Sequence, residues 1–229
     1  MNSSWEQTKL RSKYHFDNQR IDPAYDQVLS LGSFVPCWHD ELPEIISSSK
    51  PVTWRTRGAV GKSRPEEELA AEDYDLERTG YGADYEVTNL NWTIPKQLQY
   101  IANLFALDDA MTRIHVQHPG QVWNLHLDKL EKWAPTDPAS VLRVQIQLTD
   151  WQPGQFWTYG NYSHTMWSAG DVTSFDWQNI PHATANASHQ PRVTLQVTGV
   201  KTEQTQNFLR QLRSRSPYHL EGTLWHNAS

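Results

Sequence analysis

The stretch Pro191-Arg192-Val193-Thr194-Leu195-Gln196-Val197 alternates polar and apolar side chains along its length. Such alternation is typical of a half-buried β-strand, because successive side chains of a strand point to opposite sides. Arg192 and Thr194 then share one face. An inward arginine with a hydroxyl beside it offers a planar fork of hydrogen-bond donors that suits a carboxylate. The stretch therefore predicts both a strand and an anion-binding position on it.

His126-Leu127-Asp128 places two metal-binding side chains two residues apart. In an extended segment both project to the same side, so one ion can contact both while Leu127 turns away. His182 lies 54 residues beyond Asp128 (182 − 128 = 54), which leaves room for several strands before a third ligand arrives. Two imidazoles and one carboxylate suit ferrous iron whose other positions stay open for substrate or oxygen. The pattern predicts oxidation chemistry at these three residues.

Further motifs surround these residues in a consistent order. They are Pro119-Gly120, Leu142-Arg143-Val144-Gln145-Ile146, Gly170-Asp171-Val172, Phe175-Asp176, and Ile180-Pro181-His182-Ala183 leading to Asn186. With the metal and arginine motifs, the chain from Ile114 to Val200 resembles the iron(II)- and 2-oxoglutarate-dependent oxygenases. Within that superfamily it most resembles the aspartyl/asparaginyl β-hydroxylase branch, which includes bacterial hydroxylases of free amino acids.

The resemblance implies a role for each matching residue. His126, Asp128 and His182 would hold Fe(II), and 2-oxoglutarate would chelate it. Arg192, aided by the hydroxyl of Thr194, would bind the distal carboxylate of 2-oxoglutarate, and Arg143 is a second candidate for that contact. Reaction with O2 would release succinate and CO2 and hydroxylate a C–H bond, with a peptidyl or free amino acid as the expected acceptor.

Two departures and two alternatives accompany this hypothesis. Trp123 stands where some oxygenase groups have a tyrosine, whereas Asp128 is present where several β-hydroxylase relatives have no carboxylate. One alternative is a cupin-like metalloenzyme that binds another metal and uses no 2-oxoglutarate. The other is a jelly-roll binding module whose tryptophans recognise a sugar or peptide. The pair Arg192 and Thr194 argues against both alternatives.

Composition is consistent with one cytoplasmic enzyme-sized domain. The chain has 229 residues, 38% of them hydrophobic, and a mean hydropathy of −0.70. We expect no membrane segment, because no run approaches the roughly 20 apolar residues that span a bilayer, and residues 1–11 lack the apolar core of a signal peptide. A net charge of −6 argues against nucleic acid or anionic lipid as a partner. A lone cysteine, Cys37, excludes an internal disulfide.

Hydrophobic periodicity predicts a mainly β protein with flanking helices, specifically a distorted double-stranded β-helix, which is a cupin-like jelly roll. A helix should begin near Pro95 and run through Ala110. We expect residues 1–88 to wrap or cover the core, and residues 89–229 to form the oxygenase core. Strands are expected around 112–118, 121–127, 141–149, 154–159, 171–176, 183–187 and 191–199, and a final helix at 203–214.

Aromatic residues supply the candidates for substrate contact. Trp123, Trp157, Tyr81 and Tyr85 could line or shield the mouth of the pocket. Residues 80–85 are a candidate lid, because two glycines permit backbone conformations closed to most residues. The remaining histidines are expected in structural positions or at the surface; they include His115, His118, His164 and His189.

Overall fold

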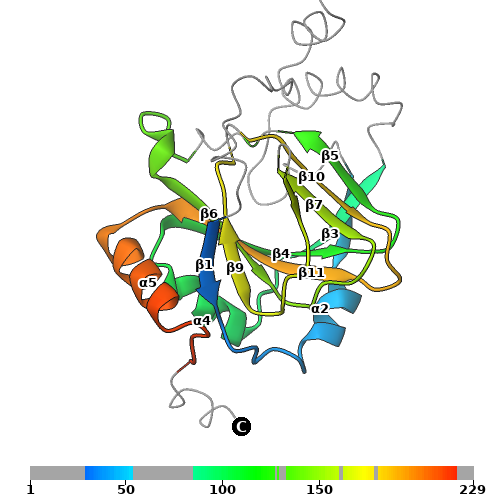
Figure 1. The fold of residues 1–229 in the computed structure, drawn as a ribbon, viewed down its shortest axis with the longest axis horizontal. Coiled ribbons are helices and arrows are strands. Elements are labelled where there is room, and N and C mark those ends of the chain that lie inside the picture. The colour runs from blue at the N-terminus through cyan, green and yellow to red at the C-terminus, as the bar shows by residue number, and fades with distance from the viewer. Residues whose placement is uncertain are drawn as a thin grey trace, which may run out of the picture.

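A computed structural model describes residues 29–53, 85–126, 128, 133–159, 162–177 and 180–220. These residues form strands with three α-helices and one 3-10 turn (Figure 1). In chain order the elements are β1 (Leu29–Ser33), α2 (Leu42–Ser48), β2 (Lys50–Thr53), β3 (Glu86–Asn91), α4 (Lys96–Leu104), β4 (Asp108–Gln117), β5 (Val122–His126), η2 (Pro138–Ser140), β6 (Val141–Gln147), β7 (Gln155–Tyr159), β8 (Tyr162–His164), β9 (Asp171–Ser174), β10 (His182–Asn186), β11 (Arg192–Val200) and α5 (Glu203–Ser214).

Two antiparallel sheets are built from these strands. The larger sheet has the order β1-β9-β6-β11-β4-β3-β2, and the smaller has the order β5-β10-β7-β8. Between β4 and β11 the chain passes repeatedly from one sheet to the other. β4 and β11 themselves are paired in the larger sheet. This connectivity is a double-stranded β-helix, a form of jelly roll. The predicted fold class, mainly β with flanking helices, is confirmed.

The alternation along β11 explains how the larger sheet is covered on both faces. Val193, Leu195 and Val197 are fully buried and belong to the principal core cluster, which includes side chains of α4 and α5. The intervening Arg192, Thr194, Gln196 and Thr198 are also buried, but they face the space between the two sheets. Each buried aliphatic side chain contributes roughly 1.5–3 kcal/mol relative to its exposed state. The apolar face anchors the helices, and the polar face lines the interior.

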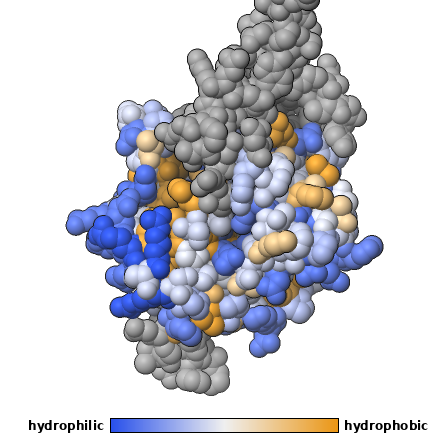
Figure 2. All heavy atoms as spheres, in the orientation of Figure 1, coloured by the Kyte–Doolittle hydropathy of each residue, from blue (hydrophilic) through white to orange (hydrophobic). Residues whose placement is uncertain are grey.

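Helix α5 covers one end of the larger sheet. Thr202 caps it, accepting from the backbone N–H of Thr205 while the Thr205 hydroxyl accepts from the Thr202 N–H. Phe208, Leu209 and Leu212 are buried. Arg210, like Arg213 and Arg215, is exposed, as expected for a solvated helix end, and Figure 2 shows strongly hydrophilic side chains on this side of the molecule.

Helix α4 is shorter than the sequence predicts. It ends at Leu104, and β4 begins at Asp108, so the predicted extension to Ala110 is wrong. Ala106 has a φ of 48°, a left-handed conformation that stops an α-helix. Its carbonyl oxygen accepts hydrogen bonds of 2.8 and 2.9 Å from the hydroxyls of Thr202 and Thr205. A contact with the distant cap of α5 therefore fixes the turn, which hydrophobic spacing alone does not indicate.

The N-terminal elements extend the same larger sheet. β1 pairs with β9 at one edge, and β2 pairs with β3, which pairs with β4, at the other. The predicted boundary at residue 88 falls inside β3. The strands predicted from residue 112 onward all correspond to observed strands, whereas β1, β2, β3, β8 and helix α2 were not predicted. Among the described residues, no helix is long and apolar enough to cross a membrane.

His164 differs from its expected surface loop. It lies in β8, half-buried, with its ring centroid 5.4 Å from that of Trp167. Burial lowers its pKa below the ordinary value, with the Coulomb effect of Asp171 acting in the opposite direction. β8 has only three residues, too few for hydrophobic periodicity to indicate a strand. Its extended conformation is stabilised by pairing with β7. His189, in contrast, is exposed in a bend after β10, as expected.

Candidate functional site

Two histidines lie side by side on adjacent strands of the smaller sheet. His126 ends β5 and His182 begins β10, and these two residues are register partners in the antiparallel pair. The Nδ1 atom of His126 lies 2.6 Å from the carbonyl oxygen of Asn124, and that of His182 lies 3.1 Å from the carbonyl oxygen of Ile180. A carbonyl oxygen only accepts, so both Nδ1 atoms carry the proton. Each Nε2 atom therefore keeps a lone pair, as a metal ligand requires.

Asp128 joins the histidines from just beyond the end of β5. Its backbone N–H donates to the carbonyl oxygen of Trp177 at 3.0 Å. Its carboxylate oxygens lie 3.7 Å from Nε2 of His126 and 3.6 Å from Nε2 of His182. Ligand atoms that each bind one ion at about 2.0–2.2 Å must lie within about 4.4 Å of each other. Each separation is within that limit; Oδ1 of Asp128 makes the one to His126, and Oδ2 makes the one to His182.

The three side chains together could hold a metal ion. One donor atom from each of His126, Asp128 and His182 lies within 4.8 Å of the others, and both histidines are buried. Two nitrogen donors and one anionic oxygen on one side of an ion are the donor set of iron sites that keep open positions. The predicted convergence of the three residues is confirmed.

Electrostatics favour a charged Asp128 carboxylate beside a neutral His182 ring. Burial by itself raises the pKa of Asp128, but Arg143, the two histidines and Arg113 outweigh burial and hold it well below its ordinary value. The pKa of His182 is lowered, chiefly by burial, although Asp128 opposes the shift. At neutral pH Asp128 is therefore an anion and His182 is neutral. These are the protonation states in which carboxylates and imidazoles bind metal.

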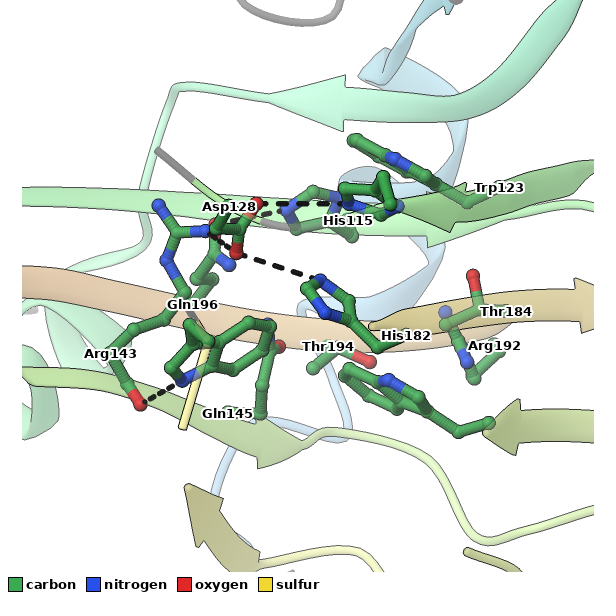
Figure 3. Close-up of a pocket in the computed structure, with 13 residues that line it drawn as sticks. His115, Trp123, Asp128, Arg143, Gln145, His182, Thr184, Arg192, Thr194 and Gln196 are labelled. Carbon is green, nitrogen blue, oxygen red and sulfur yellow. Dashed lines mark hydrogen bonds and ion pairs between the residues drawn. The ribbon is translucent and has the colours of Figure 1, made fainter. Parts of the chain in front are cut away.

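A pocket of about 410 Å³, counted to its open mouth, surrounds this cluster (Figure 3). Its walls come from both sheets, because inward side chains of β4, β6 and β11 face those of β5, β7 and β10. The lining residues are His115, Trp123, His126, Asp128, Arg143, Gln145, Trp157, Trp177, His182, Thr184, Arg192, Thr194 and Gln196.

Arg192 enters the pocket without a hydrogen-bond partner at two of its nitrogens. The side chain is buried, and neither Nε nor Nη1 contacts an acceptor among the described residues. Its guanidinium carbon lies 4.7 Å from the centroid of the Trp157 ring, so the aromatic face supports the cation. Burial lowers the pKa of Arg192 to about 10, which leaves it charged at neutral pH. Buried donors without partners are uncommon and suit an anionic ligand.

Thr194 and Arg143 line the pocket but make other contacts. The Thr194 hydroxyl donates to Oε1 of Gln147 at 3.1 Å, so its single hydrogen is already used. Arg143 pairs with Asp128 through Nη1 and donates from Nε to the Thr198 hydroxyl at 2.8 Å. Thr194 and Arg192 share a face as predicted. Arg143 faces inward as predicted, but it contacts a metal-ligand candidate.

The sequence predicts a structural or surface position for His115, and the structure places it in the pocket. Its ring centroid lies 5.5 Å from that of Trp123, and its Nε2 atom lies 3.2 Å from Oε1 of Gln196. Gln196 also accepts a hydrogen bond from Arg113. Burial, followed by the nearby Arg113, lowers the pKa of His115 well below its ordinary value. The signal that could have revealed it is its place opposite Thr194 on the paired strand.

The tryptophan and tyrosine candidates divide into three groups. Trp123 and Trp157 line the pocket, and Trp177 lines it as well. Tyr85 instead packs beside the small cluster of Val52, Val87 and Leu90. Tyr81 and most of the candidate lid, residues 80–84, lie outside the described residues.

Comparisons with known proteins add a distant structural likeness. No protein-family model and no curated protein matches the chain. A predicted oxalate decarboxylase from Thermotoga maritima is 13% identical over 68% of this chain and 96% of its own, with a TM-score of 0.36. A sugar phosphate isomerase of a cupin superfamily from Silicibacter pomeroyi is 16% identical over 41% and 51%, with a TM-score of 0.30. A Cupin 2 conserved barrel domain protein from Salinispora arenicola is 13% identical over 54% and 84%, with a TM-score of 0.31. The fold assignment rests on the strand order.

Proposed function

We propose that this protein is an Fe(II)- and 2-oxoglutarate-dependent dioxygenase that hydroxylates a C–H bond of a peptidyl or free amino acid. The donor set of His126, Asp128 and His182 fits ferrous iron, as argued above. The fold is compatible with many chemistries, so the proposal depends on the site and not on the fold.

The proposal rests chiefly on Arg192, whose Nε and Nη1 atoms have no hydrogen-bond partner among the described residues and which lies in the same pocket as the metal ligands. 2-Oxoglutarate has one carboxylate to chelate a metal beside its keto group and a second carboxylate at its other end. A buried cation in the pocket would bind that second carboxylate, and the ligand would satisfy nitrogens that otherwise lack acceptors. In the cupin-like alternative, which uses no 2-oxoglutarate, this cation would instead hold an acidic substrate.

Each side chain has a distinct task in the proposed reaction. His126, Asp128 and His182 would hold the iron, and Arg192 would orient the cosubstrate, with Trp157 packed against its guanidinium. With 2-oxoglutarate and O2, bound iron supplies the oxidation that converts C–H to C–OH and releases succinate and CO2. Trp123, Trp157 and Trp177 form apolar walls that limit water in the pocket. The chain thus binds, orients and shields, while the cofactor supplies the oxidation.

An anaerobic titration tests the proposal directly. Protein loaded with Fe(II) is titrated with 2-oxoglutarate and, separately, with 2-oxovalerate, which has the same chelating end but no distal carboxylate. We expect the visible metal-to-ligand charge-transfer band with both compounds, and much tighter binding of 2-oxoglutarate. Arg192→Met should abolish most of this preference, whereas Arg210→Met, an exposed arginine on α5, should retain it.

Other outcomes would point to other functions. If Fe(II) binds but neither oxo acid produces a band, the protein is a metalloenzyme of another kind. If no divalent metal binds at all, the jelly-roll binding module becomes the better hypothesis. For the acceptor, succinate release is screened against free amino acids and peptides, and product mass identifies the hydroxylated compound.

A further inference from the structure

We infer that Arg143 is a positioning residue of the metal centre: it holds one carboxylate oxygen of Asp128, so that the other oxygen is presented to the ion. The Nη1 atom of Arg143 pairs with Oδ2 of Asp128, the oxygen that lies 3.6 Å from Nε2 of His182. This leaves Oδ1, which lies 3.7 Å from Nε2 of His126, to face the ion. The inference rests on the metal centre of the proposed function, but it does not depend on the use of 2-oxoglutarate.

Asp128 needs such a partner more than the histidines do. Strand pairing places His126 and His182, and a backbone carbonyl orients each ring. Asp128 lies beyond the end of β5, and its backbone is held by a hydrogen bond to Trp177. A backbone contact does not set the rotation of a carboxylate about its terminal bond, because that torsion is broad. The guanidinium of Arg143 does set it.

Arg143 is itself held from several directions. Its Nε atom donates to the Thr198 hydroxyl at 2.8 Å, and its guanidinium carbon lies 5.2 Å from the centroid of Trp177 and 6.0 Å from that of Trp133. Its backbone carbonyl accepts from the Trp177 indole at 2.9 Å and from the Ser174 hydroxyl at 2.8 Å. The residue that supports Asp128 is thus immobilised at both backbone and side chain.

The two pocket arginines therefore differ in role. Figure 3 shows the carboxylate of Asp128 between Arg143 and His182, with Arg192 on the other side of His182. Arg143 pairs with the carboxylate of Asp128, whereas Nε and Nη1 of Arg192 have no acceptor among the residues that the structure describes. Arg143 is accordingly assigned to the metal ligand and not to the cosubstrate.

Two opposing effects of Arg143 on metal affinity can be separated. Its positive charge repels a divalent ion, so removal would tighten binding if charge alone mattered. Its hydrogen bond orients a ligand, and loss of such outer partners costs about 10- to 100-fold in metal affinity. Positioning should dominate because Asp128 offsets the charge of Arg143. A carboxylate that binds through one oxygen also leaves more positions open on the ion.

The test measures Co(II) binding by competition with a chromogenic chelator, together with the visible absorption of bound Co(II), which reports the ligand set without turnover. We expect Arg143→Met to weaken binding about 10- to 100-fold and to change the spectrum. Arg143→Lys, which keeps the charge without the forked geometry, should also weaken binding. Arg210→Met, which removes an exposed arginine on α5, should leave both Co(II) affinity and spectrum unchanged.

Equal or tighter Co(II) binding by Arg143→Met, with an unaltered spectrum, would overturn the inference. If that variant does not fold, Thr198→Val decides, since it retains Arg143 but removes its hydroxyl acceptor. Weaker binding with a shifted spectrum supports positioning, and wild-type behaviour overturns it. Failure of the wild-type protein to bind Co(II) or Fe(II) would instead reject the metal centre and with it the proposed function.

Discussion

His126 and His182 lie directly opposite each other on β5 and β10, with ring centroids 4.3 Å apart. The next pair in this ladder joins Thr184 to Trp123, so β5 contains one residue more than β10 between the two pairs. Such an extra residue is a β-bulge, which redirects side chains. It allows Trp123 and His126 to line the same pocket, although their odd spacing would place them on opposite faces of a regular strand.

The metal centre predicts a large loss of affinity when a ligand is removed. His182→Ala, His126→Ala and Asp128→Ala should each weaken Fe(II) or Co(II) binding by more than about 100-fold, because losing a direct ligand costs more than losing its outer partner. Equilibrium dialysis with metal analysis measures the effect. His189→Ala is the matched control, since His189 is exposed just beyond β10. Wild-type affinity in His182→Ala would exclude this residue as a ligand.

We expect Arg192 to strengthen 2-oxoglutarate binding and to lower the stability of the ligand-free fold. Arg192→Met should weaken 2-oxoglutarate binding by about 2–5 kcal/mol, or roughly 30- to 4000-fold, because the distal carboxylate would lose a buried charged partner. Without ligand, the same variant should be at least as stable as wild type, since it removes a buried cation with unsatisfied nitrogens. Thermal unfolding of metal-free protein checks the second point. A strong loss of stability would show that Arg192 is chiefly structural.

Acid should destabilise the metal-free protein. Burial lowers the pKa values of His115, His164 and His182 in the folded state, so the unfolded chain binds protons first as the pH falls below about 6.5. Each such histidine contributes a loss of up to about 1.4 kcal/mol per pH unit in that range. Urea unfolding with a chelator present, between about pH 7.5 and 5, measures the slope.

Substitution of one buried histidine isolates its share of this pH dependence. His164→Gln cannot take up a proton, so the stability of the variant should fall less steeply with decreasing pH than that of wild type. His189→Gln, which changes an exposed ring, serves as the control and should retain the wild-type slope. Identical slopes for His164→Gln and wild type would show that His164 does not contribute.

Gly170 and Gly120 provide a matched test of a close backbone approach. Both have a positive φ, 96° and 88°. A Cβ on Gly170 would lie 2.1 Å from the carbonyl oxygen of Phe34, whereas one on Gly120 would meet nothing within 4 Å. Gly120→Ala should cost about 1–2 kcal/mol of backbone strain. Gly170→Ala should cost clearly more, because Gly170, just before β9, and Phe34, just after β1, must move apart. Equal unfolding free energies would contradict the close approach.

Much of the core was predictable because its strands carry strong local signals. Alternation in β11 indicated both the strand and the shared face of Arg192 and Thr194, and the spacing of His126 and Asp128 indicated their convergence. The short strand β8 and the early end of α4 were not predictable. β8 is only three residues long and is ordered by its hairpin with β7, whereas the end of α4 is set by a hydroxyl contact from Thr202, which is distant in the sequence.

The sequence by itself determined which residues have the chemistry of a metal and anion site, since residue type and spacing specify donors, charge and strand faces. Only the tertiary structure decided how those donors are partnered. Strand register and a bulge determine three features of the site. Arg143 pairs with Asp128, two nitrogens of Arg192 lack acceptors among the described residues, and His115 lines the pocket. These arise from packing between segments far apart in sequence, so local pattern does not encode them.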